Sequence, residues 1–488
     1  MKKHHLGQLM LFAAAAACAI LPAGCSSREP EAPITFQTPF PRESREFAQL
    51  DEMVKLFCRE NPDVEVTLLP EGSARPDFVL RGIVAGTAAD VIELPLHSLQ
   101  AVASQTALLE LSEALEANTG RIISSELAAA EYEGRLVAAP IRASSVQLIY
   151  NCDVLRDAGY RPNDPLLGNW TELLRTCESI EYYLADDGCR PLAIAGGEGK
   201  PLAALFAMLV RQTGGWIVHA DDQPAENALP WCLAVDGEAG IRALEMFARL
   251  MDYMPKDVLS WTRRDLVREF AAGRVGMCYG DTALLSEILA AEPDMEAGVV
   301  KAPVGGFFAS YVTTYGAIIP ARARRREACE RLLAFLTGRR AQEIVMTGGQ
   351  TGCPAFVSIR RDLLDSDWNT RHPRYRKFVE GLNSAAAASP NGIGQGRQWP
   401  PIAGWAEVER RVVIPELRLL ARGDVTPESA AEKIRRVGDL ALVTHYRSLG
   451  HVEKTEQLAM AFLAVGVFFL VLFAVGHRSK ETPQDGSR

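Results

Sequence analysis

One stretch, residues 134–160, constrains the fold more than any other part of the chain. Two short apolar segments lie on either side of residues 142–145, which are small or polar. In the second segment, 146–151, both alternating sets of side chains are mostly apolar, which is typical of a strand covered on both faces. Asn151 is placed to cap a following helix that stops at Gly159. A strand pair broken at 142–145 predicts a chain that leaves one lobe and begins a second.

The region before this stretch alternates strands and helices. Its expected elements are strands at 34–36, 64–68 and 90–94, a helix opened by Ser44 and closed by Asn61, and a second helix at 76–85. The order strand-helix-strand-helix-strand predicts an α/β fold with a parallel sheet.

Charge and cysteine usage exclude several classes of function. The formal net charge is −9 and the pI is near 5.6, whereas nucleic-acid binding needs a concentrated basic surface. The ten cysteines show no Cys-x-x-Cys spacing, and no His-Glu-x-x-His or Gly-x-Ser-x-Gly motif is present. We therefore expect no cofactor, no metal and no enzymatic activity. Cys177 and Cys189 either form a disulfide or remain buried thiols, and the sequence leaves both open.

The N-terminus has the pattern of an export signal. Lys2 and Lys3 precede an apolar run over 9–21, and small residues lead to Cys25. This predicts a signal peptide at 1–25 and a polar tether at 26–33. Cys25 after Ala-Gly also resembles a lipoprotein processing site, so both lipidation of Cys25 and plain cleavage nearby stay open.

The C-terminal region contains a long uncharged segment. Residues 458–476 are apolar throughout and, as a helix, match the thickness of a hydrocarbon core. A buried core helix is the alternative, but such a helix rarely stays apolar on every face. We expect a transmembrane helix at 458–476 and a cytoplasmic tail at 477–488. The rest of the chain would then face the periplasm or the outside of the cell.

Several passages together resemble the bacterial extracellular solute-binding proteins of the carbohydrate type. Members of that family, which include the maltose-binding proteins, are the binding subunits of ABC importers. The passages that carry the resemblance are 83–91, 140–155, 273–281, 302–306, 315–320 and 348–354. They run in the family's order over most of the chain.

The resemblance implies a bilobed periplasmic-binding-protein fold of type II, with two α/β lobes joined by hinge crossovers. The first lobe would comprise 34–142 and 313–358, and the second 143–312 and 359–448. Ligand would lie between them.

The resemblance also implies where ligand is bound. Sugar sites combine aromatic faces with polar groups that meet the hydroxyls. The ligand-binding candidates at strand ends, in the crossover and among the tryptophans are Glu93, Arg142, Ser144, Trp216, Tyr279, Asp281, Trp399 and Trp405. Ser144 stands where maltose-type relatives carry an acid, which leaves the ligand open. A purely structural role remains the alternative for each candidate.

The predicted function is capture of a small ligand, most simply a sugar or similar polyol, and its delivery to ABC transporter permease subunits. The alternative is a membrane-anchored receptor or sensor that is not coupled to import. A secreted hydrolase with a two-carboxylate cleft is a third class, since scattered acidic residues do not exclude one.

Overall fold

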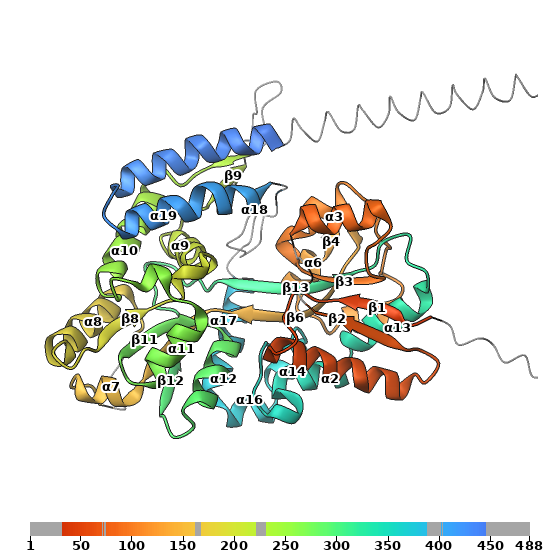
Figure 1. The fold of residues 1–488 in the computed structure, drawn as a ribbon, viewed down its shortest axis with the longest axis horizontal. Helices are drawn as coiled ribbons and strands as arrows, with labels where there is room; N and C mark the ends of the chain where they lie inside the picture. Colours follow the sequence, from red (N-terminus) through yellow and green to blue (C-terminus); the bar gives the residue numbers. More distant parts are fainter. Residues whose placement is uncertain are drawn as a thin grey trace, which may run out of the picture.

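The computed structural model describes residues 32–70, 72, 75–161, 167–220, 231–387, 402 and 404–445. These residues form two α/β lobes that lie side by side, with strands β6 and β13 running between them (Figure 1). The predicted bilobed α/β fold is confirmed.

The first lobe is built on a five-stranded sheet of order β2-β1-β3-β13-β6. Its strands are β1 Ile34–Gln37, β2 Val66–Leu69, β3 Val91–Pro95, β6 Ala139–Ser145 and β13 Val312–Ile318. Its helices are α2 Arg45–Glu60, α3 Pro76–Ala85, α4 Leu99–Ala103, α5 Glu116–Thr119, α6 Ser124–Ala129, α13 Arg326–Leu336 and α14 Arg339–Thr347, with a small hairpin of β4 Glu131–Tyr132 and β5 Arg135–Leu136. Strands β1, β2 and β3 are parallel, and β13 is antiparallel to both of its neighbours.

Local signals set the boundaries of the early elements as predicted. Ser44 caps α2, because its side chain accepts a hydrogen bond from the Phe47 amide at 3.1 Å, and Asn61 follows the last residue of the helix. Gly86 ends α3 in the left-handed conformation, with φ at 70°.

The second lobe is built on a four-stranded sheet of order β12-β7-β11-β8. Its strands are β7 Gln147–Asn151, β8 Arg190–Ala193, β11 Val275–Gly280 and β12 Ala297–Val300, with a separate pair of β9 Val218–Ala220 and β10 Trp231–Leu233. Its helices are α7 Cys152–Asp157, α8 Trp170–Leu184, α9 Lys200–Gln212, α10 Glu238–Asp252, α11 Arg263–Ala271, α12 Thr282–Ala291, α15 Arg361–Leu364, α16 Asp367–Arg371, α17 Pro373–Ala387, α18 Trp405–Val408, α19 Ile414–Ala421 and a last helix over 427–445.

Short helical turns complete the described chain. They are the 3-10 turns η1 Leu96–Ser98, η2 Gly196–Glu198, η3 Val258–Ser260 and η4 Gly349–Thr351, and the π turn η5 Glu409–Val413.

The break predicted at 142–145 is wrong. Strand β6 continues through Ser145, because β13 pairs with it residue by residue, with Val312 opposite Ser145 and Thr313 opposite Ser144. Small and polar side chains do not end a strand whose backbone is held by a neighbour. Only Val146 separates β6 in the first sheet from β7 in the second. Asn151 caps α7 as predicted, accepting from the amides of Asp153 and Val154.

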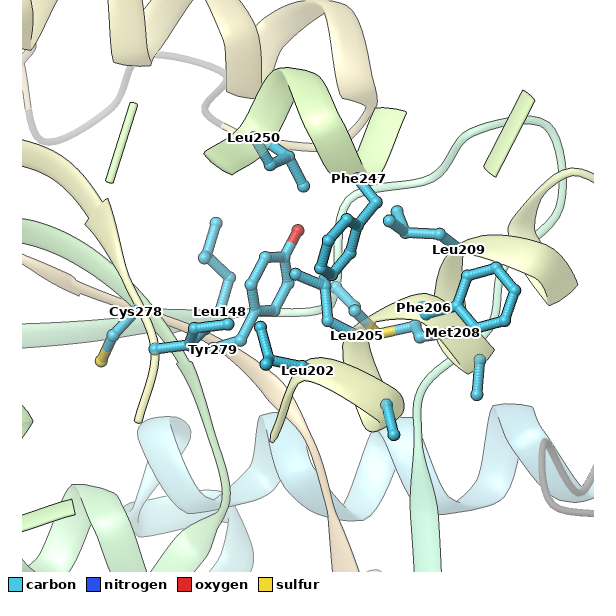
Figure 2. Packing of buried hydrophobic residues seen from close by; sticks show 14 of the residues in the cluster. Leu148, Leu202, Leu205, Phe206, Met208, Leu209, Phe247, Leu250, Cys278 and Tyr279 are labelled. Carbon is cyan, nitrogen blue, oxygen red and sulfur yellow. The ribbon is translucent and has the colours of Figure 1, made fainter. Parts of the chain in front are cut away.

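Each lobe has its own apolar core. In the second lobe, α9 is buried on nearly every face, and Figure 2 shows its Leu202, Leu205 and Leu209 packed towards Phe247 of α10 and Tyr279 of β11. Burial of each such side chain contributes about 1.5–3 kcal/mol. Helix α12 belongs to both cores, since Ala283 packs in the first and Leu285 in the second.

Cys177 and Cys189 are both free thiols inside the second lobe. Burial raises the pKa of Cys189 to about 11 and raises that of Cys177 further. The structure therefore decides for buried thiols in place of a disulfide.

Several sequence features lie outside the described residues. They are the leader, Cys25, Trp399 and the apolar segment 458–476. Within the part of the chain that the structure describes, no helix is both long enough and apolar enough to span a bilayer, and no cluster of potential metal ligands is found.

Candidate functional site

A group of charged side chains gathers on the second lobe where it faces the first. Asp281 caps α12, with its Oδ1 accepting from the Leu284 amide at 2.9 Å. Arg263, the first residue of α11, donates through Nη2 to Asp281 Oδ1 at 3.2 Å and through Nε to Glu287 Oε2 at 2.9 Å. Between a quarter and a third of each of these three side chains is exposed. The group therefore remains open to solvent and to a ligand.

The first lobe reaches this group through two residues. Ser144 of β6 donates through Oγ to Asp281 Oδ2 at 3.2 Å, a direct hydrogen bond between the lobes. Glu46, in the first turn of α2, lies close enough for its charge to raise the pKa of both Arg263 and Glu287. We call Glu46, Ser144, Arg263, Asp281 and Glu287 the interlobe cluster.

In the interlobe cluster, burial and neighbouring charges shift the pKa values in opposite directions. Burial lowers the pKa of the Arg263 guanidinium, but Asp281, Glu287 and Glu46 more than compensate and raise it. Burial raises the pKa of Glu287, and Arg263 partly offsets this. Two carboxylates thus bind one guanidinium, and the charge of a third acts on it. Such a site offers strong acceptors to hydroxyl groups and repels an anionic ligand.

An aromatic group borders the interlobe cluster on the side of the first lobe. Phe40, Tyr315 and Phe356 have ring centroids 5.1–5.6 Å apart. Phe356 is buried, whereas Phe40 and Tyr315 are half-buried and present part of their rings. Burial, followed by the charges of Glu93 and Asp281, raises the pKa of the Tyr315 hydroxyl, so it stays protonated and can donate. Aromatic faces next to planar polar groups suit a sugar ring.

Sequence reasoning missed four residues of this region, which are Phe40, Tyr315, Glu46 and Arg263. The two aromatic residues were missed because tryptophan was sought as the stacking residue. One signal was available for Phe40. It follows β1 in the loop that enters α2, and loops after the carboxyl ends of parallel strands are where α/β sheets bind ligands.

Two of the predicted contacts, Glu93 and Arg142, bind each other. The Arg142 guanidinium donates to both carboxylate oxygens of Glu93, each at 2.7 Å, and neither side chain is exposed. A fork-shaped guanidinium matches a carboxylate well, and the two occupy each other's hydrogen-bonding groups. In this conformation neither is open to a ligand.

The remaining described candidates lie inside the second lobe. Tyr279 is 7% exposed and points into the core shown in Figure 2, and Trp405 is 2% exposed in the same core. Trp216 is half-buried, with the Arg211 guanidinium 3.6 Å from its ring centroid. Among the predicted contacts, the structure thus brings Ser144 and Asp281 together.

With this geometry established, comparison with known proteins identifies the family. A model of the family described as bacterial extracellular solute-binding protein matches residues 52–375. The chain belongs to the bacterial extracellular solute-binding proteins. Binding proteins of Brucella abortus and Brucella suis are 24% identical to this solute-binding protein over 296 residues, which cover 59% of this chain. The match spans 64% of the length of those relatives.

Solved structures share the fold of this solute-binding protein. The GacH receptor of Streptomyces glaucescens, solved unliganded and with acarbose, superposes with a TM-score of 0.68 at 18% identity and covers 84% of this chain and 98% of its own. A solute-binding protein of Thermotoga lettingae bound to α-D-tagatose gives 0.68 at 19%, covering 84% and 99%. Maltose-bound MalE3 of T. maritima gives 0.67 at 21%, covering 83% and 98%.

These findings confirm the predicted family. The family consists of extracellular solute-binding proteins and is not an enzyme family.

Proposed function

We propose that this solute-binding protein holds a neutral carbohydrate or similar polyol between its lobes and passes it to the permease subunits of an ABC importer. The observation that carries the proposal is the interlobe cluster, in which Ser144 of one lobe meets Asp281 of the other beside partly exposed aromatic rings. The carboxylates accept hydrogen bonds from hydroxyl groups, and the rings of Phe40 and Tyr315 cover an apolar sugar face.

The excess of carboxylates narrows the ligand class. Arg263 is flanked by Asp281 and Glu287, and Glu46 faces them from the first lobe. A phosphorylated or carboxylated sugar would meet like charge there. Proteins of similar fold carry acarbose, α-D-tagatose or maltose, but another carries glycerophosphocholine, so the charge argument rests on the interlobe cluster alone.

Ligand capture would proceed by hinge closure. In place of the expected boundary after 142, we take the first crossover at Val146, between β6 of the first sheet and β7 of the second, so that this short link is one of the hinges. The other expected boundaries, after 312 and after 358, are kept. Ligand contacts from both lobes would favour the closed state over the open one.

Export and anchoring complete the proposal. The extracellular family agrees with the leader at 1–25. We propose further that residues 458–476 anchor the protein in the membrane, with the tail 477–488 in the cytoplasm, and that Cys25 is lipidated. Alkylation of a cysteine placed in the tail should then require permeabilised cells.

The binding proposal is tested by thermal unfolding of the full chain in detergent. Maltose, α-D-tagatose and acarbose serve as neutral probes, and tagatose 6-phosphate is the anionic match for tagatose. A bound sugar at 100 times its Kd should stabilise the folded state by about 2.7 kcal/mol. Equal stabilisation by tagatose and its phosphate would refute the charge argument, and no stabilisation by any neutral probe would refute the ligand class.

A further inference from the structure

Arg142 lies at a junction that the binding site does not explain. Its guanidinium is fully buried and uses all three nitrogens. Besides the two bonds to Glu93, Nη1 donates to the backbone carbonyl of Glu46 at 2.7 Å. Glu93 in turn accepts from the Thr38 hydroxyl at 2.5 Å. The Arg142–Glu93 pair thereby holds the chain on both sides of the loop 38–44, which carries Phe40. Glu93 bonds Thr38 before it, and Arg142 bonds the first turn of α2 after it.

The guanidinium also contacts a second connection between the lobes. It lies 4.9 Å from the ring centroid of Phe40 and 4.3 Å from that of Phe356. Phe356 belongs to the segment 354–358, whose Val357 exchanges two backbone hydrogen bonds with Ala143 at 3.0 and 2.7 Å. The loop 38–44, strand β6 and the segment 354–358 therefore meet at Arg142.

The backbone of β6 is irregular at the same place. Tyr315 pairs with Arg142, but the next residue of β13, Gly316, pairs with Pro140, so Ile141 is an extra residue. Such a bulge bends a strand and increases its twist. The buried amide of Gln342 fixes the bulge, since it donates to the Ile141 carbonyl at 2.6 Å and accepts from the Ser358 hydroxyl at 2.9 Å.

We propose that Arg142 is a positioning residue that couples the bulge of β6 to the loop 38–44 and so sets the angle between the lobes. A shift of the Phe40 loop is transmitted through the fork of hydrogen bonds to the strand that enters the second lobe. The angle between the lobes can be measured in the ligand-free protein, so this part of the proposal does not depend on which ligand is bound. The further step, that ligand contact at Phe40 drives closure through Arg142, rests on the proposed function.

The test uses Arg142→Lys, which keeps the charge but loses the fork. Arg360→Lys is the matched control. Arg360 is 5% exposed and binds Asp362 through two bonds of 2.9 and 3.0 Å, but its other partners are Asn118 and the Thr337 carbonyl, away from the loop 38–44. Both variants remove a two-bond contact to a carboxylate from a buried arginine, so a general loss of packing affects both.

The first readout is the distance between the lobes in the full-length, ligand-free protein. Bioorthogonal spin labels at Val84 on α3 and Tyr182 on α8, which are 71% and 82% exposed, report it by pulsed electron resonance. We expect a shifted or broader distance distribution for Arg142→Lys and a wild-type distribution for Arg360→Lys. Equal broadening in both variants, or a wild-type distribution in Arg142→Lys, overturns the proposal. Phe40→Leu, at a half-buried ring, should give a smaller shift in the same direction and decides the matter if Arg142→Lys does not fold.

The second readout is affinity for maltose and α-D-tagatose. Arg142→Lys should bind at least tenfold more weakly than the wild type, and Arg360→Lys equally well per folded molecule. If the wild type binds neither sugar, the proposed ligand class fails, while the ligand-free distances still decide the role of Arg142.

Discussion

Two arginine–carboxylate groups lie near the junction of the lobes, and they differ in solvent access. Arg142 and Glu93 are fully buried in the first lobe, and every polar group of the pair has a partner within it. Arg263 of the second lobe instead makes one bond to each of two carboxylates, Asp281 and Glu287, and its side chain is 30% exposed. The same residue types thus serve structure in one place and a candidate site in the other. Solvent access, more than chemistry, separates the two roles.

The largest expected effect comes from breaking the buried pair. Glu93→Ala leaves the Arg142 charge buried without its counterion, which should lower the free energy of unfolding by about 3–5 kcal/mol. Urea unfolding followed by circular dichroism measures it. Arg263→Ala is the counterpart in the exposed group and should cost about 1 kcal/mol or less. Similar losses for the two variants would remove the distinction between a buried and an open group.

The exposed group should instead affect binding. Asp281→Asn keeps a residue that can cap α12 but loses the charged acceptor, so stability should change by less than about 1 kcal/mol. Affinity for the bound sugar should fall about tenfold, equivalent to ~1.4 kcal/mol. Isothermal titration calorimetry measures this. Unchanged affinity would show that Asp281 serves only as the helix cap.

A smaller effect concerns pH. The pKa of Glu287 in the folded protein is raised above its ordinary value of 4.5, chiefly by burial. Between the unfolded and folded pKa values of Glu287 the folded state binds more protons. The contribution of Glu287 to stability is therefore fully present below 4.5 and is lost as pH rises through the folded pKa. Glu287→Gln should flatten this decline in a series of unfolding curves above pH 4.5. The opposite change, a steeper decline in the variant, would mean that the pairing with Arg263 dominates over burial.

Local sequence signals predicted the elements because the responsible groups are neighbours in the chain. Ser44 caps α2 through an amide three residues away, and Asn151 does the same for α7. Long-range pairing was not predictable in this way. The sequence of residues 142–145 predicts a break between two strands. These residues form a strand only because β13 lies beside them.

The candidate site shows the same division. Tyr279 and Asp281 stand two residues apart at the end of β11, yet one lies in the core and the other at the junction of the lobes. The chain changes direction between Tyr279 and Asp281, at Gly280 and the start of α12. No periodicity in the sequence predicts the direction in which the chain continues. Trp405 is of a residue type that can stack on a sugar ring, but it packs inside the second lobe.

By itself, the sequence determined the order of strands and helices, their caps, the bilobed α/β class and the resemblance to an extracellular binding family. The tertiary structure decided which polar groups are sealed and which remain open. Glu93 and Arg142 are 49 positions apart, and Ser144 and Asp281 are 137 apart. Whether such groups meet, and whether water reaches them, depends on how two independently packed cores are held against each other, and no stretch of chain encodes that alone.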